Sequence, residues 1–314
     1  MGGSSGLYLR MLMKNSFPAL RAVSLSLVYL LSCAVLATGL AYPLHLMSGG
    51  SLDIRVAVTR GSLILVILGS WFWVKRLRLD RHSLGFGQAS GSLRLVLQWF
   101  ARGVLMLGLH CVVLVMLGIR EPDWPVLGEG QRVMTGLLQA LGIGFLVATI
   151  EEIIFRGILL AALQRSAGTL VAILCSALYY AILHFFRVDR SLVLPEPSFY
   201  SSFSVLNLAL HPVFNPPPDS SLALFFAGLF LAVVRLHKPN GLACCVGLHA
   251  GWVFVIKSFK TLTDGHPESE WAFLVGSYDG FIGYLAAGWM GVVTLLLLVR
   301  SYRNPQDQPG SGSS

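Results

Sequence analysis

Two adjacent glutamates and an arginine interrupt a run of apolar residues in the stretch VATIEEIIFRGILL, residues 147–160. Glu152 and Arg156 are four residues apart, so one helical turn brings them to the same face, in the favourable acid-before-base order. This spacing predicts an ion pair. Glu151 is rotated by about 100° from Glu152 on a helix, so the two carboxylates should not share one partner equally. Glu151 is then left to act on another group, and a carboxylate tuned by its surroundings is what a general base requires.

Two histidines lie in later apolar runs, His184 in YYAILHFFR and His249 in VGLHAGWVF. An ionisable side chain in hydrocarbon is costly unless it is paired or hydrated, so such groups are expected to be functional. At 1.5 Å per residue, Glu151 lies about 18–21 Å and His184 about 24 Å from a turn predicted near residues 165–168. These depths predict that the two side chains meet. His249 is shallower, at about 12 Å into its run, so helix tilt or a re-entrant start of its span is needed to bring it to the same place.

The elements that position these residues are predicted to be membrane-spanning helices. Of the 314 residues, 55% are hydrophobic and only 12% are charged, whereas a soluble domain carries about a quarter charged residues. Apolar runs recur at roughly the 20-residue length that crosses a hydrocarbon core. The chain is therefore expected to be an all-α, polytopic membrane helix bundle with about eight transmembrane helices. They are predicted near residues 19–46, 56–74, 95–119, 134–163, 168–186, 220–236, 241–258 and 279–299.

A single membrane domain over residues 1–314, with its core at about 134–258, is the simplest organisation, because no internal repeat is visible. The glycine- and serine-rich ends, 1–6 and 310–314, read as artificial linkers. All five cysteines fall within predicted spans and their number is odd, which favours packing roles over a disulfide framework.

The charge pattern indicates topology. The net charge is +8, but the basic residues flank apolar runs and do not form a separate domain, which argues against a nucleic-acid partner. Lys and Arg concentrate before the first span and after the second, so both termini are expected in the cytoplasm. We expect an integral, multi-pass protein of a bacterial plasma membrane, with the lipid bilayer and a membrane-anchored peptide or protein as its partners.

The polar motifs resemble those of the CPBP family, the CAAX-protease and bacteriocin-processing group of glutamic intramembrane proteases. EEIIFR matches the family's EExxxR signature, and Tyr180–His184 matches an aromatic residue followed four positions later by His. The third motif, His followed four positions later by Asn or Asp, is present only in part, because His249 is followed by Val253. The motifs occur in the family's order, within predicted spans four to seven.

The resemblance implies a CAAX-like intramembrane endopeptidase that needs no cofactor. Glu151 and His184 would activate a water for attack on a peptide carbonyl. Glu152 and Arg156 would hold these groups in position, and His249 would donate to the developing oxyanion, a contact that often dominates rate enhancement.

Val253 has no side-chain donor, so half of the implied oxyanion site is missing. Trp252, Asn207 or a backbone N–H could supply it, and the sequence does not choose among them. The same gap leaves open a non-catalytic membrane immunity or scaffold protein of the same fold. A zinc-dependent membrane protease is a further alternative, since two histidines and a glutamate form a familiar zinc set. Against zinc, the chain has no HExxH motif and places Arg156 beside the glutamates.

Overall fold

The computed structural model describes residues 4–87, 92–189, 191–194, 196–238, 240–276 and 278–303, with the side chains of the first helix described from Leu20 on. The long helices are α1 (Ser4–Met47), α2 (Ile54–Arg76), α3 (Ser92–Met116), α5 (Gly130–Glu152), α7 (Thr169–Leu183), α8 (Phe199–Phe214), α9 (Pro218–His237), α10 (Gly241–Leu262) and α11 (Tyr284–Arg303). Shorter elements are α4 (Trp124–Gly128), the π-helix η1 (Ile153–Leu159), α6 (Leu160–Ala167), the 3-10 helix η2 (Ala272–Leu274), and strands β1 (Arg120–Pro122) and β2 (Thr263–Gly265).

The predicted all-α membrane bundle is confirmed. Six stretches are long and apolar enough to cross a membrane: Leu20–Met47, Ile54–Arg76, Ser92–Met116, Gly130–Ala167, Pro218–His237 and Gly241–Leu262. The other two predicted spans coincide with shorter apolar helices, Thr169–Leu183 and Tyr284–Arg300. The count of eight crossings therefore stays a prediction, because the apolar stretches of these two helices are shorter than those of the six and fall at or below the lower end of the length that crosses a bilayer.

The chain divides into two compact units, each made of two separate segments. Unit 1 comprises Met1–Leu79 and Ile158–Pro216, and unit 2 comprises Asp80–Gly157 and Pro217–Ser314. The predicted core, 134–258, contributes to both units. Of the two predicted linkers, residues 1–3 and 310–314 lie outside the described residues, and residues 4–6 form the first turn of α1.

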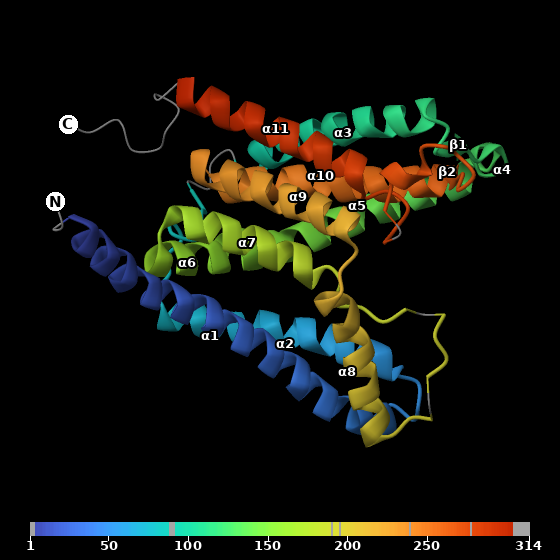
Figure 1. Cartoon of the computed structure of the whole chain (residues 1–314). Coiled ribbons are helices and arrows are strands. Elements are labelled where there is room, and N and C mark those ends of the chain that lie inside the picture. Colours follow the sequence, from blue (N-terminus) through green and yellow to red (C-terminus); the bar gives the residue numbers. More distant parts are fainter. Residues whose placement is uncertain are drawn as a thin grey trace. The chain divides into compact units, whose positions relative to one another are not determined.

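Unit 1 is built on α1 and α2, which pack along each other and against α8 (Figure 1). Small and β-branched side chains fill the contact, among them Ala41, Val58 and Val205. On α7, Tyr179 donates its hydroxyl to Val23 O (2.8 Å) and accepts from Ser26 Oγ (3.1 Å), which fastens α7 to α1. These bonds fix the helix that ends just before His184.

Unit 2 is organised around α10, which packs against α3, α5 and α9 (Figure 1). Glycines let the backbones approach closely, as at many membrane helix interfaces. A methyl group at Gly103 of α3 would lie 2.4 Å from Leu248 O, and one at Gly247 of α10 would lie 2.2 Å from Val96 O. On the α5 side, a methyl at Gly144 would lie 2.9 Å from Ala250 O. These close approaches fix the position of α10 along its own axis relative to α3 and α5.

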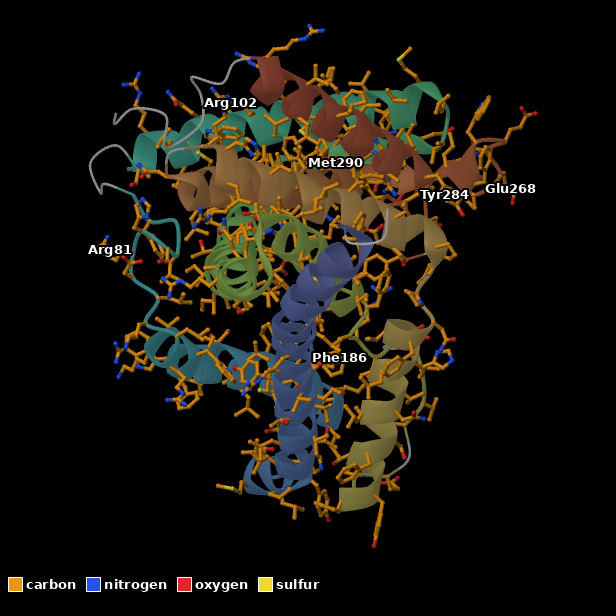
Figure 2. All side chains as sticks on the ribbon, turned by 60° about the vertical axis from the view of Figure 1, so that its left-hand side comes forward. Arg81, Arg102, Phe186, Glu268, Tyr284 and Met290 are labelled. Carbon is orange, nitrogen blue, oxygen red and sulfur yellow. The ribbon has the colours of Figure 1, made fainter. Side chains whose placement is uncertain are left out.

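A two-stranded antiparallel sheet connects the C-terminal ends of α3 and α10 outside the apolar spans. β1 pairs antiparallel with β2, with Arg120 opposite Gly265. The buried Arg120 donates from Nε to Thr263 Oγ1 (2.7 Å) and lies over the Phe259 ring. Figure 2 shows Glu268, which follows β2, at the end of unit 2 opposite Arg81 and Arg102.

The glycine contacts give a prediction about stability. Gly103→Ala should destabilise the protein by about 1–3 kcal/mol, because the added methyl meets a backbone carbonyl that cannot rotate away. Gly108→Ala on the same helix is the matched control, since a methyl there meets nothing within 4 Å and alanine has the higher helix propensity. Thermal unfolding of both variants in detergent would measure the difference. Equal unfolding temperatures would contradict the proposed close contact.

Candidate active site

The predicted ion pair between Glu152 and Arg156 forms, and both residues are fully buried. Arg156 Nη1 donates to Glu152 Oε1 over 3.3 Å, and Nη2 donates to Gly228 O of α9 over 3.1 Å. The guanidinium therefore joins α9 to the end of α5. Gly228 contributes only its backbone carbonyl, which no residue-type pattern in the sequence could reveal.

The local backbone at this motif is unusual. The α-helix ends at Glu152 and gives way to the π-helix η1, which contains Arg156. π-helical turns are rare and occur frequently at functional sites. Glycine at 157 lies within this segment, where a methyl group would still find Leu84 O at an ordinary 3.6 Å. A regular α-helix was expected across this segment, so the π-helix is a correction.

His249 of α10 lies between the two carboxylates. Its Nδ1 is 2.8 Å from Glu152 Oε1, and its Nε2 is 3.9 Å from Glu151 Oε2. Because Glu152 can only accept when ionised, the hydrogen bond assigns a proton to Nδ1 and leaves Nε2 facing Glu151. The two contacts are unequal, as the helical rotation between Glu151 and Glu152 predicts. The shallower depth estimated for His249 does not separate it from the glutamates, because α10 packs directly against α5.

The two glutamates differ in how far their side chains are buried. Glu152 is 0% exposed, and its Oε2 has no hydrogen-bond partner among the described residues. The Glu151 side chain keeps 24% of its surface exposed. Glu152 is therefore an anchored charge, whereas the Glu151 side chain is partly exposed, with its Oε2 buried beside His249.

His184 belongs to unit 1, so its distance from Glu151 stays a prediction. It caps the C-terminus of α7 and is partly buried. Its Nδ1 lies 2.7 Å from Tyr180 O, and its ring contacts the Tyr180 ring with centroids 4.3 Å apart. The aromatic residue of this motif thus packs on the histidine that it precedes by one turn.

Val253, which lacks a donor, and the two side chains that could replace it differ in their surroundings. Val253 is partly buried on α10, and Asn207 is an exposed residue of α8 in unit 1. Trp252 is 5% exposed, and its ring centroid is 6.3 Å from that of His249.

A metal site needs several ligand side chains that converge on one point. Among the described residues, no group of three or more His, Cys, Asp or Glu side chains is arranged to hold a metal ion. Within unit 2, the Glu152 carboxylate is already neutralised by Arg156 and bonded to His249.

Together, the apolar helices and this buried cluster define a polytopic helical membrane protein with a carboxylate–imidazole centre between α5 and α10. Residues 133–255 match the family model described as type II CAAX prenyl endopeptidase Rce1-like. This match supports the CAAX-protease family that the motifs resemble and, with it, a CAAX-type intramembrane protease. It covers Glu151, Glu152, Arg156, His184 and His249. The comparisons with curated proteins and with solved structures found no match.

The buried ion pair can be tested by removing its cation. Arg156→Leu should destabilise the protein by about 3–5 kcal/mol, because it leaves the buried Glu152 charge without its guanidinium. Arg132→Leu is the matched control, since Arg132 pairs with Glu129 on the surface with 61% and 57% of the side chains exposed, where an ion pair contributes about 0–1 kcal/mol. Unfolding in detergent provides the measurement. A similar loss of unfolding free energy in both variants would show that the buried ion pair contributes no more to stability than the exposed one.

Proposed function

We propose that the protein is an intramembrane endopeptidase in which Glu151, together with His184, activates a water for attack on a peptide carbonyl. The observation that carries this proposal is the arrangement around His249, with one fully buried glutamate bonded to Nδ1 and one partly exposed glutamate facing Nε2. A partly exposed carboxylate beside an oriented imidazole is suited to general acid–base chemistry.

In the proposed reaction, Glu151 takes a proton from the water as its oxygen attacks the carbonyl carbon. The carbonyl π-electrons move to oxygen, and the tetrahedral intermediate carries a negative charge. Collapse of the intermediate breaks the C–N bond, and the proton held by Glu151 passes to the leaving amine. No covalent acyl-enzyme is formed.

Glu152 and Arg156 are assigned positioning roles. Glu152 holds His249 through Nδ1, and Arg156 holds Glu152 while bonding to Gly228 O. His249 Nε2 then points to the region beside Glu151, where its protonated form would donate to the intermediate's oxygen. This arrangement follows the logic of catalytic triads, in which a buried carboxylate orients an imidazole.

The proposed substrate is a membrane-anchored peptide or protein. The description of the matching family names a prenyl endopeptidase, so a prenylated C-terminal peptide is the first substrate to test. Apolar helices on both sides of the polar centre suit a substrate that reaches it from the bilayer.

Glu151→Gln is expected to lower kcat by at least about 100-fold, because it removes a general base while preserving the side chain's shape. Cleavage of an internally quenched, farnesylated CAAX-type peptide by the reconstituted protein would report it. Glu129→Gln, an exposed change at the start of α5, should leave the rate unaltered. Full activity of the Glu151 variant would refute the assignment of the base. Absence of cleavage by the wild-type protein across membrane-anchored peptides would favour the non-catalytic scaffold, for which Val253 is the sequence argument.

A cofactor-independent mechanism predicts that metal chelators leave the cleavage rate unchanged. The physical reason is that the positively charged Arg156 is paired with Glu152 and repels a cation that would bind nearby. The rate would be measured before and after treatment with 1,10-phenanthroline and after addition of zinc. Loss of turnover that zinc restores would establish the zinc-dependent alternative.

A further inference from the structure

Trp252 carries a buried hydrogen-bond donor with no acceptor. The residue is 5% exposed, and its Nε1 has no hydrogen-bond partner among the described residues. The indole N–H can only donate, and burying such a group without an acceptor costs about 1–3 kcal/mol. The indole N–H of Trp252 is therefore available to an acceptor that the described residues do not supply.

The indole lies on the side of α10 that carries His249. Three residues correspond to a rotation of about 300°, so Trp252 is displaced by only about 60° around the helix and by about 4.5 Å along it. The ring centroids of His249 and Trp252 are 6.3 Å apart. The indole ring therefore lies close to the imidazole that Glu152 orients.

The proposed reaction needs a second hydrogen-bond donor to the developing oxyanion, beside His249. His249 Nδ1 is bonded to Glu152, so the histidine has only Nε2, 3.9 Å from Glu151 Oε2, to offer to the intermediate's oxygen. A tetrahedral intermediate develops negative charge on oxygen, and preorganised donors aimed at that oxygen contribute strongly to catalysis. Val253, which is about 40° from His249 on the other side of the same face, has no donor to give.

We propose that Trp252 Nε1 donates a hydrogen bond to the carbonyl oxygen of the scissile peptide as this oxygen becomes negatively charged. The inference rests on the proposed endopeptidase function and adds a catalytic residue to it. No proton is transferred by the indole; it stabilises the oxyanion until the C–N bond breaks.

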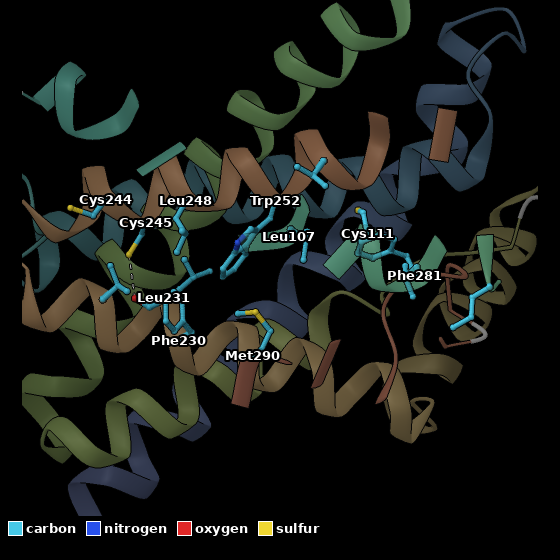
Figure 3. Close-up of a cluster of buried hydrophobic side chains, with 14 residues drawn as sticks. Leu107, Cys111, Phe230, Leu231, Cys244, Cys245, Leu248, Trp252, Phe281 and Met290 are labelled. Atoms are coloured by element: carbon cyan, nitrogen blue, oxygen red, sulfur yellow. Dashed lines mark hydrogen bonds between the residues drawn. The ribbon is translucent and has the colours of Figure 1, made fainter. Parts of the chain in front are cut away.

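Packing alone does not account for the indole nitrogen. Trp252 extends from α10 into the buried cluster of unit 2, toward Phe230 of α9 (Figure 3), with ring centroids 6.0 Å apart. That contact requires an aromatic ring and would be met by phenylalanine. Trp289 of α11 offers the comparison, because its Nε1 is also buried without a partner among the described residues, and the proposed mechanism gives it no part.

The test compares Trp252→Phe with Trp289→Phe in the reconstituted full-length protein, using the farnesylated peptide assay. Trp252→Phe should lower kcat by about 100- to 1,000-fold, the usual effect of removing one oxyanion donor, with KM changed by less than threefold. Trp289→Phe should match the wild type. If Trp252→Phe fails to fold, benzothienylalanine incorporated at 252 replaces only the N–H by sulfur, and the same loss in kcat is expected.

The outcomes separate this inference from the function on which it rests. Cleavage that is lost in Glu151→Gln but equal in Trp252→Phe and Trp289→Phe would overturn the role of Trp252 and leave the endopeptidase intact. A Trp252 variant that raises KM with kcat unchanged would likewise overturn it. No cleavage by the wild-type protein would overturn both proposals.

Discussion

The buried charge of Glu152 is the constraint on which the centre of unit 2 depends. A carboxylate removed from water is tolerated only when opposite charge and hydrogen bonds compensate for its lost hydration. Arg156 supplies the charge from the next turn, and His249 supplies a hydrogen bond from another helix. The carbonyl of Gly228 in turn satisfies part of Arg156. One buried oxygen thus determines how α5, α9 and α10 meet.

The glycines and the charged cluster depend on each other. The hydrogen bond from His249 Nδ1 to Glu152 is 2.8 Å long, so a small displacement of α10 along α5 would break it. Gly144 allows Ala250 O to approach α5, and Gly103, Gly247 and Gly251 allow α10 to lie against α3. The close backbone contacts therefore bring the helices near enough for the polar atoms to bond. Small residues would permit many axial positions of α10 along its neighbours, and the hydrogen bond between His249 and Glu152 favours one of them.

The sequence predicted those features that reside in residue type and spacing. The helical membrane architecture follows from apolar run length, and the Glu152–Arg156 pair follows from the four-residue interval. Features that depend on tertiary packing could not be predicted. The height of α10 against α5 is set by glycine contacts, so the depth estimate for His249 was too simple. The bond to Gly228 involves a backbone atom, and the π-helix after Glu152 has no pattern of residue types that we recognise as its cause.

The order of the segments has a consequence for biosynthesis. Glu152 precedes His249 by 97 residues, and the intervening chain includes Ile158–Pro216, which belongs to unit 1. At about 5–20 residues per second, the glutamate leaves the ribosome about 5–20 seconds before the histidine that will bind it. Arg156 emerges almost at once and sits on the same nascent helix. The arginine therefore accompanies a charged residue through membrane insertion before the remainder of its binding site has been made.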